Sequence, residues 1–367
     1  MLVAHYSVRA QKSGLITRYW NHLVNDTTEL YKAEFLAYPT LAYSPETSWE
    51  LGVSSVFVFY ARRDTTNRLS EVNGFTFFTL ENQYGLWFDH ALYSHQNRWF
   101  TLGRMRFQSY PIRYHGIGIY TPGEHIADVN ANQLQIKERV LRKVYKSFYA
   151  GIEADYQRLS SVEFIPNQNA TLDYPTGSNG SANFGIGAGI LYDNRHNILN
   201  VRHGFFSELA ILNYHHFWGS DHSFKTIISD TRYYHSINKR DVLAFQAYGQ
   251  FNAGDTPFNQ LALLGGETIM RGYYLGRFRD KNLVAAQVEY RMLPLPLGFT
   301  NRWGAAVFAS TGTVSGSLGA LSKKNMLWAA GGGVRFLIFQ KKDIFTRLDV
   351  AFTREGTGIY IFIGEAF

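Results

Sequence analysis

Residues 344–367, IFTRLDVAFTREGTGIYIFIGEAF, contain the pattern that decides the fold. One set of alternate positions is mostly apolar and the other carries charge: Ile344, Thr346, Leu348, Val350 and Phe352 against Phe345, Arg347, Asp349 and Ala351. A period of two indicates a β-strand with two unlike faces. The strand after it runs to the last residue, Phe367. A soluble protein seldom ends on such a sticky edge, whereas a membrane barrel pairs its last strand with its first.

Similar alternating segments recur from about residue 31 to the end, and no helical period extends over a comparable length. Their length suits membrane strands, which need about 9–11 residues at a tilt of ~45°. We predict about sixteen strands, at residues 33–44, 48–61, 70–81, 84–95, 98–109, 133–145, 147–158, 181–192, 202–213, 222–234, 241–252, 282–293, 301–311, 325–338, 343–354 and 357–367.

Composition agrees with this fold class. Aromatic residues make up 16% of the chain and charged residues 18%, where about 25% is typical, and 33 residues are glycine. No run approaches the ~18 consecutive apolar residues of a membrane helix. Transmembrane β-barrels combine these features because their strands are apolar toward lipid and polar toward the lumen. We expect an all-β, transmembrane antiparallel β-barrel in a single domain, residues 33–367.

An even strand number places both termini on the periplasmic side and makes each odd-to-even connection extracellular. The longest connection, 253–281, is of this kind, and we expect it to fold into the lumen. Residues 1–32 stand apart as a short amphipathic segment with helical spacing or, equally, as a leader that is unstructured or processed. The first residues lack the basic and apolar regions of a secretory signal, which an outer-membrane protein requires.

Several functional classes find no support. The chain has no cysteine, which removes disulfides, cysteine-ligated zinc and thiol nucleophiles. Its net charge of +7 comes from scattered residues rather than a stripe that would bind nucleic acid. Sequence motifs of hydrolases, nucleotide-binding loops and zinc proteases are missing. One polar cluster, His215, His216, Asp221 and His222, fits a hydrated turn better than a metal site, because adjacent histidines point to opposite faces. We expect no enzyme activity, cofactor or metal.

The connection 265–281, GGETIMRGYYLGRFRDK, is the most informative loop. Gly272 permits a tight backbone, and Arg271 can project toward carboxylates on inward faces. A buried arginine is costly unless it is paired. Glu289 and Asp349 lie on faces that we assign to the lumen and are candidate partners. The alternative is an ordinary mobile extracellular loop.

Five stretches together carry a family resemblance. They are Ile269-Met270-Arg271-Gly272-Tyr273; Gly185 to Gly204 with Asp193-Asn194-Arg195; Gly331 to Arg335 with Arg347 to Phe352; Gly364 to Phe367; and Tyr38-Pro39 through Ser44 to Gly52. In this combination the chain resembles the barrel of the BamA/TamA outer-membrane superfamily, of the bacterial surface-antigen type. The resemblance covers about residues 33–367.

The resemblance implies a location in the bacterial outer membrane and a role in inserting, assembling or translocating polypeptides, or lipids. It implies that Arg271, Gly272 and Tyr273 form a loop tip folded into the lumen, that Asp193 and Arg195 form the family's turn, and that Phe367 belongs to the signal read by the assembly machinery. A weak seam between the first and last strands would accept a client strand by β-augmentation. The implied partners are outer-membrane lipids, periplasmic or lipoprotein partners and client polypeptides, but no nucleic acid.

Two departures from the family pattern matter. Only about thirty residues precede the first strand, so neither periplasmic repeats nor a patatin-like lipase is expected, and partner proteins would dock the clients. Ser310 stands where the family has the aspartate that pairs with the loop arginine, which makes Glu289 the first candidate partner of Arg271 and Asp349 the second. The alternative function is a passive pore or a structural barrel subunit of a larger envelope complex. An enzyme with a Ser–His pair at one rim is third.

Overall fold

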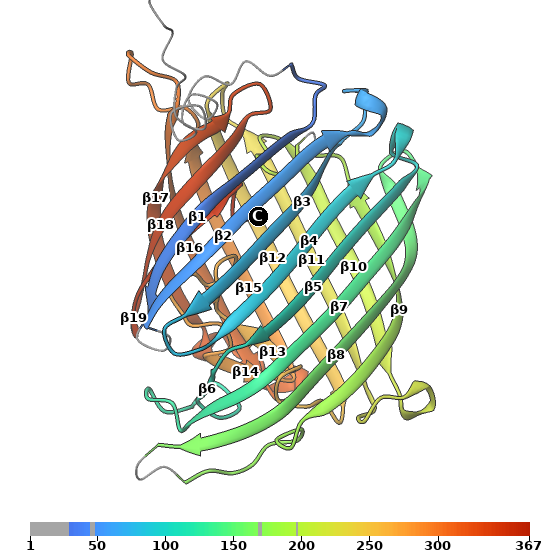
Figure 1. Ribbon diagram of the computed structural model, residues 1–367, viewed down its shortest axis with the longest axis vertical. Helices are drawn as coiled ribbons and strands as arrows, with labels where there is room; N and C mark the ends of the chain where they lie inside the picture. The colour runs from blue at the N-terminus through green and yellow to red at the C-terminus, as the bar shows by residue number, and fades with distance from the viewer. Residues whose placement is uncertain (1–28, 45–47, 168–170, 196) are drawn as a thin grey trace, which may run out of the picture.

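The computed structural model describes residues 29–44, 48–167, 171–195 and 197–367. These residues form an all-β fold in which sixteen strands of eight or more residues curve around a common interior (Figure 1). The long strands are β1 (Glu34–Ser44), β2 (Ser48–Tyr60), β3 (Leu69–Thr79), β4 (Tyr84–Tyr93), β5 (Trp99–Ser109), β7 (Ala127–Tyr145), β8 (Phe148–Pro166), β9 (Ser181–Asp193), β10 (Gly204–Tyr214), β11 (Phe224–Ser236), β12 (Asp241–Gly254), β15 (Asn282–Met292), β16 (Trp303–Ser315), β17 (Leu327–Phe339), β18 (Ile344–Thr353) and β19 (Gly356–Ile363).

Shorter elements complete the described chain. Strand β6 (Ile112–Tyr114) pairs with β7, and β13 (Ala262–Leu264) pairs with β14 (Phe278–Asp280) in a separate ribbon. Five single turns of 3-10 helix lie in connections: η1 (Ala61–Arg63), η2 (His95–Asn97), η3 (His216–Trp218), η4 (Leu318–Ala320) and η5 (Lys323–Asn325). Within the described ranges, no helix has the length and apolar character needed to cross a membrane.

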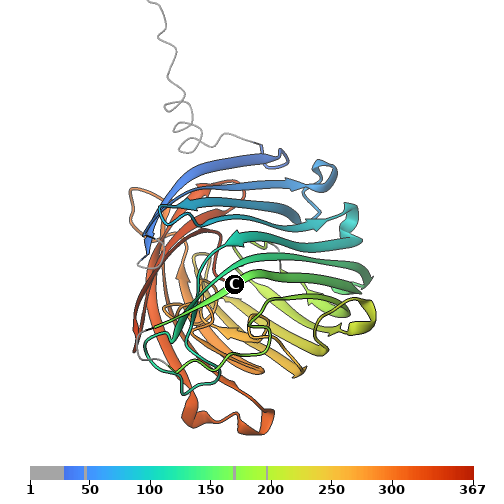
Figure 2. The same cartoon turned by 60° about the horizontal axis from the view of Figure 1, so that its bottom comes forward.

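Each long strand pairs antiparallel with the next long strand in the chain. The β1–β2 ladder runs from Glu34 opposite Val58 to Ser44 opposite Ser48, and the final ladder, β18–β19, runs from Thr346 opposite Ile363 to Thr353 opposite Gly356. The sheet curves so far that its first and last strands approach each other (Figures 1 and 2). No backbone pairing between β1 and β19 occurs among the described residues. We call this junction the seam.

The two faces of the sheet reverse the pattern of a soluble protein. On β8, the outward side chain of Ile152 is 69% exposed, whereas the neighbouring inward side chains of Glu153 and Asp155 are 2% exposed. On β15, Glu289 and Arg291 are both inward and fully buried. An apolar outer face and a charged inner face are the arrangement that a lipid environment requires. The predicted all-β antiparallel fold is confirmed.

Two predicted strand boundaries are wrong by six residues or more, and the strand predicted at 301–311 continues to Ser315 as β16. The strands predicted at 133–145 and 147–158 continue as the 19-residue strands β7 and β8. Their extra residues form a hairpin that projects past the neighbouring strands, at the lower end in Figure 1. A bulge between Asn130 and Asn132 shifts the register of this hairpin. The bulge interrupts the alternation of inward and outward side chains. The sequence pattern therefore predicts strands that are too short.

The last strand is also shorter than predicted. It ends at Ile363 rather than at Phe367. Gly364 has a φ of 83°, a left-handed conformation that glycine adopts without steric cost. The chain turns there, and residues 365–367 enter the interior. The predicted segment 1–32 lies outside the described residues, apart from residues 29–32.

Candidate functional site

The β12–β15 connection passes through the interior of the curved sheet. Its ribbon β13–β14 and its tip form an apolar cluster with inward residues of β15, β16 and β17. The buried members are Ala262, Leu264, Ile269, Met270, Tyr273, Phe278, Leu283, Ala285, Val314, Leu327 and Ala329. This packing attaches the connection to the inner wall over much of its length. It is therefore a built part of the interior rather than a loop extending into solvent.

Arg271 is at the centre of the site. Its side chain is fully buried, and its guanidinium donates to Asp349 Oδ2 at 2.6 Å and to Glu289 Oε2 at 2.5 Å. The guanidinium carbon also lies 3.4 Å from the centre of the Phe308 ring. Arg271 thus contacts both carboxylates that the sequence offered as alternatives, on two different strands, β15 and β18.

Four more charged side chains surround Arg271, Glu289 and Asp349: Arg291, Arg335, Arg347 and Glu365. We call these seven residues the anchoring cluster. Arg291 Nε lies 2.8 Å from Glu289, and Arg347 Nη1 lies 2.6 Å from Asp349. Arg335 contacts two carboxylates: its Nη1 lies 2.5 Å from Asp349 Oδ1, and its Nη2 lies 3.1 Å from Glu365 Oε2. Four cations therefore share three carboxylates, and each charge has opposite neighbours that offset its desolvation.

The sequence analysis did not single out Arg291, Arg335, Arg347 or Glu365 as site residues. Arg291 and Arg347 occupy inward positions of the strands that carry Glu289 and Asp349, and Arg335 occupies an inward position of β17. Their charge on an inward face is the signal that could have identified them. Glu365 could not be found in this way, because it was assigned to a strand that ends two residues earlier.

Gly272 is where the loop tip meets the wall. Its φ is 104°, and a Cβ built there would lie 2.6 Å from Thr353 Cγ2 on β18. Its amide donates to the Tyr360 hydroxyl of β19 at 2.9 Å. Only glycine combines this conformation with so close an approach. The neighbouring Tyr273 is buried and donates its hydroxyl to the Trp328 carbonyl at 3.3 Å.

The connection makes further contacts with the β18–β19 side of the sheet. Arg277 Nε lies 2.5 Å from Glu355 in the β18–β19 turn, and Arg347 of β18 donates to the Glu267 carbonyl at 3.0 Å. Burial lowers the pKa of the nearby His115 to about 4, and the positive charge of Arg277 adds to this effect. The imidazole is therefore neutral at neutral pH. The loop is thus attached to the C-terminal flank of the seam, and Tyr274, Arg277 and Arg279 also attach it to residues 111–121.

Asp193 and Arg195 form a compact turn directly after β9. Arg195 places Nε 3.0 Å from Asp193 Oδ1 and Nη2 3.1 Å from Oδ2. Asp193 Oδ2 also lies 2.9 Å from Arg68 Nη1 and accepts a hydrogen bond of 3.2 Å from the Tyr93 hydroxyl. This turn therefore joins β9 to β4 and to the β2–β3 turn, and it is far from Arg271 in the chain.

The rest of the β9–β10 connection reaches the C-terminal flank. Arg202 pairs with Asp343 through two hydrogen bonds of 2.5 and 2.8 Å, and Asn197 donates to the Lys342 carbonyl at 2.9 Å. The Leu199 carbonyl accepts from the Glu365 amide at 3.0 Å. The connection thus contacts both the β17–β18 turn and the C-terminal tail.

Phe367 lies inside the sheet rather than on its last strand. It is 4% exposed and packs with Val201, Tyr234, Ala244 and Ala366. Arg291 donates to the Phe367 carbonyl at 3.0 Å. The C-terminus is thereby linked to the anchoring cluster through Arg291.

The seam is bridged by side chains at one end. Lys342, in the β17–β18 turn, forms a buried ion pair with Glu34, the first residue of β1. An apolar cluster around this pair takes residues from both flanks: Leu36, Val56, Val58, Leu69, Leu199, Ile338, Phe339 and Ile344. These contacts replace, at this end, the backbone ladder that joins the other neighbouring long strands.

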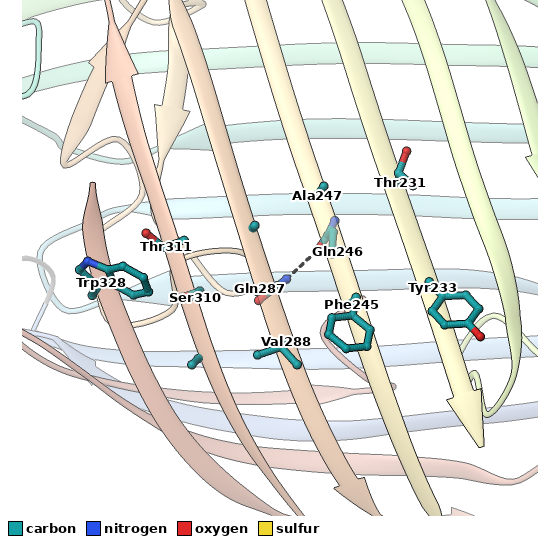
Figure 3. A pocket seen from close by; sticks show the side chains of 12 residues that line it. Thr231, Tyr233, Phe245, Gln246, Ala247, Gln287, Val288, Ser310, Thr311 and Trp328 are labelled. Atoms are coloured by element: carbon teal, nitrogen blue, oxygen red, sulfur yellow. Dashed lines mark hydrogen bonds between the residues drawn. The ribbon is translucent and has the colours of Figure 1, made fainter. Parts of the chain in front are cut away.

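A hollow of about 440 Å³ lies on β11, β12, β15, β16 and β17 (Figure 3). Tyr233, Phe245 and Trp328 surround it with exposed rings, and its lining contains no charged side chain. Gln246 and Gln287, which also line it, are hydrogen bonded to each other at 2.5 Å. The hollow belongs to the apolar outer surface and offers no groups for catalysis.

The histidine-rich turn serves local structure. His216 Nδ1 lies 2.7 Å from the Ser220 carbonyl, and His222 Nδ1 lies 2.8 Å from the Asp255 carboxylate. Among the residues with described positions, no group of three or more histidine, aspartate or glutamate side chains could hold a metal ion.

An antiparallel sheet with an apolar outside, a charged inside and a loop anchored across its interior defines the class of outer-membrane β-barrels. Residues 79–338, more than half of the sequence, match the Omp85 superfamily domain. The chain belongs to the Omp85 superfamily. Barrels of this superfamily are bacterial outer-membrane proteins that act in polypeptide insertion or translocation.

Solved structures show the same fold at low sequence identity. BamA from Haemophilus ducreyi lacking POTRA domains 1–3 is similar with a TM-score of 0.55 and 14% identity, over 90% of this chain and 69% of that one. CdiB from Acinetobacter baumannii is similar with a TM-score of 0.58 and 10% identity, over 90% of this chain and 59% of that one. CdiB from Escherichia coli is similar with a TM-score of 0.54 and 9% identity, over 90% of this chain and 61% of that one. This chain thus spans about six tenths of either CdiB. No curated protein matches it.

Proposed function

We propose that this protein is a sixteen-stranded outer-membrane barrel that assists the insertion, assembly or translocation of polypeptides through a seam between β1 and β19. The observation that carries the proposal is the lack of backbone pairing between these two described strands, in a sheet whose other long strands pair with both neighbours. Unpaired strand edges can add a client strand by β-augmentation. Both termini face the periplasm, and the β12–β15 connection begins on the extracellular side.

The interior loop holds the C-terminal flank of the seam. Arg271 contacts β15 and β18, Gly272 contacts Tyr360 of β19, and Arg277 contacts Glu355 between them. These contacts keep β18 and β19 in place when the seam opens. On the N-terminal flank, β1 is attached to β2 by its ladder and to the opposite flank by the Glu34–Lys342 ion pair and its surrounding cluster. Opening therefore moves β1 away from a fixed β19.

The remaining site residues support this arrangement. Asp193 and Arg195 brace the turn that reaches from β9 to both flanks, and Phe367 fixes the C-terminal tail and forms part of the signal for membrane assembly. Periplasmic or lipoprotein partners bring client polypeptides to the seam. The chain has no catalytic role in this proposal.

The test is a folding assay with a client. The protein is reconstituted in phosphatidylcholine–phosphatidylglycerol vesicles, and a urea-unfolded eight-stranded barrel is added. We expect the client to fold faster than in empty vesicles. Because the chain contains no cysteine, the double variant Glu34→Cys, Lys342→Cys can be cross-linked across the seam with a short bis-maleimide, and this should abolish the acceleration.

The matched control places cysteines at Ala37 and Ser55, which already face each other in the β1–β2 ladder. Cross-linking there should leave the acceleration intact. Retained acceleration after seam cross-linking would reject the seam mechanism. Absence of any acceleration, together with ion conductance that neither cross-link changes, would instead indicate the passive pore.

A further inference from the structure

The charged side chains are distributed unequally between the two ends of the barrel. At the end that carries the termini, exposed cations occupy five hairpin turns and outnumber the carboxylates of the same turns, Asp64 and Asp343. The cations are Arg62, Arg63, Arg98, Arg142, Lys146, Lys239, Arg240 and Lys341. At the opposite end, exposed carboxylates outnumber exposed cations: Glu81, Glu124, Glu163, Asp173, Asp221, Asp255 and Glu355 against Lys225, Lys323, Lys324 and Arg354.

Three adjacent turns of the termini end form one continuous surface, which we call the basic rim: residues 61–68, 94–98 and 142–147. The Arg68 amide donates to Asn97 Oδ1 at 2.9 Å, which joins the first turn to the second. The Lys143 amide donates to the Arg98 carbonyl at 2.8 Å, which joins the second to the third. Hydrogen bonds therefore hold the backbones of the three turns that carry the rim cations next to one another.

Exposed aromatic rings lie directly beside these cations. Arg142 lies over the ring of Trp99 at 5.7 Å, and Lys146 lies over the ring of Tyr145 at 5.1 Å. Trp99 begins β5 and Tyr145 ends β7, so both rings mark the end of the apolar outer face. Aromatic girdles of membrane barrels lie at the level of the lipid headgroups. The basic rim therefore lies where lipid phosphates are found.

The backbone of the first turn gives independent support. Arg62 and Arg63 have φ values of 55° and 58°. Side chains rarely adopt this left-handed region, and asparagine or glycine would fill it at lower cost. Two consecutive arginines at such positions place charge at the rim despite the conformational penalty. Observed strain of this kind points to a function for the side chains.

We propose that the basic rim binds the phosphate of an anionic phospholipid, such as phosphatidylglycerol, in the membrane leaflet on the side of the termini. The cations supply charge for the phosphate, and Trp99 and Tyr145 supply an amphipathic surface for the glycerol region. Each cation near an anionic membrane surface strengthens binding by about fivefold. This binding fixes the depth and tilt of the barrel beside β5, β7 and β8. It requires that the barrel spans a membrane, but it does not depend on the insertion role.

The test uses the full chain in a neutral detergent. We titrate dioctanoyl phosphatidylglycerol or dioctanoyl phosphatidylcholine and follow lipid binding by native mass spectrometry and the midpoint temperature of the heat-modifiable folded band. We expect phosphatidylglycerol to bind more tightly and to raise the midpoint more than phosphatidylcholine. The variant R62Q/R98Q/R142Q/K146Q should bind phosphatidylglycerol at least ~10-fold more weakly. The matched control, K225Q/K323Q/K324Q/R354Q, removes four cations from the opposite end and should keep the preference.

Four further results would overturn the proposal. Equal binding of the two phospholipids would remove the anionic preference, and tighter binding of lipid A would move the rim to the other leaflet. Binding of poly-glutamate without a preference for phosphatidylglycerol would assign the rim to an acidic protein. If the rim variant fails to fold, the wild-type protein still tests the proposal. A preference for phosphatidylglycerol that rests on exposed charges should be abolished by 0.5 M salt. A preference that survives this salt contradicts the proposal.

Discussion

The two junctions of β1 differ in kind. Toward β2, β1 is held by a continuous ladder from Glu34 to Ser44. Toward β19, it is held by the Glu34–Lys342 ion pair and the apolar cluster around Leu36. A ladder must break many hydrogen bonds together, whereas a side-chain contact can open at one end. In the proposed mechanism, this difference gives the described sheet a defined place to open, on one side of a single strand.

The two flanks of the seam also differ. β18 and β19 are attached from inside through Arg271, Gly272 and Arg277 of the interior loop. The buried apolar contacts of β1 lie instead at the end near the termini, around Leu36. In the proposed mechanism, the C-terminal flank is therefore the fixed side of the seam and β1 is the side that moves. Variants that weaken the contacts of one flank at a time test this difference.

The largest effect is expected in the anchoring cluster. The variant Glu289→Gln leaves four guanidinium groups with two carboxylates and should lower the free energy of unfolding by about 5 kcal/mol, at the upper end of the cost of breaking a buried ion pair. Arg271→Ala leaves three cations with three carboxylates and should cost less, while changing the single-channel conductance by freeing the loop tip. Urea unfolding in detergent measures both costs. Equal stability of Glu289→Gln and wild type, or identical conductance of Arg271→Ala, would contradict this role.

A smaller effect is expected at the seam itself. Glu34→Gln leaves the Lys342 ammonium buried without its partner and should cost about 3 kcal/mol. The double variant Glu34→Gln, Lys342→Met should recover much of that stability, because an apolar pair of similar size avoids the desolvation of both charges. The control is Lys32→Gln, which breaks an exposed pair with Glu29 at 3.6 Å and should have little effect on stability because solvent screens the pair. A Glu34→Gln variant no less stable than Lys32→Gln would show that the ion pair does not hold the seam.

The smallest of the three effects is expected at the C-terminus. Deletion of Phe367 removes a buried ring from the cluster with Val201 and Tyr234 and should cost about 2 kcal/mol. It should also lower the yield of heat-modifiable barrel in membranes. Phe367→Leu keeps most of the apolar contact and separates the two effects. A normal barrel yield after the deletion would count against a role of Phe367 in assembly.

The alternation of side chains along the strands made most of the fold predictable. Strands with one charged inward face, such as β15 and β18, were assigned with boundaries close to those observed. The same alternation placed Glu289 and Asp349 inside, and Arg271 is near both. These features follow from a period of two and from the cost of an unpaired buried charge.

What could not be predicted depends on contacts between distant segments. The inward turn at Gly364 requires the Leu199 carbonyl as a partner for the Glu365 amide, and this contact joins residues far apart in the chain. The extension of β7 and β8 requires the bulge at Asn130, which breaks the pattern on which strand prediction relies. The pairing of Glu34 with Lys342 joins the two ends of the sheet. No local pattern encodes it.

Residue-resolved amide hydrogen exchange of β1 tests the central claim most directly. Alternate amides of a strand point to opposite neighbours, so β1 contains its own control. We predict that the β1 amides facing β2 exchange slowly, that those facing β19 exchange rapidly, and that β2 is protected on both sides. Equal, slow exchange of all β1 amides would mean that a closed ladder joins β1 to β19, and it would contradict the seam.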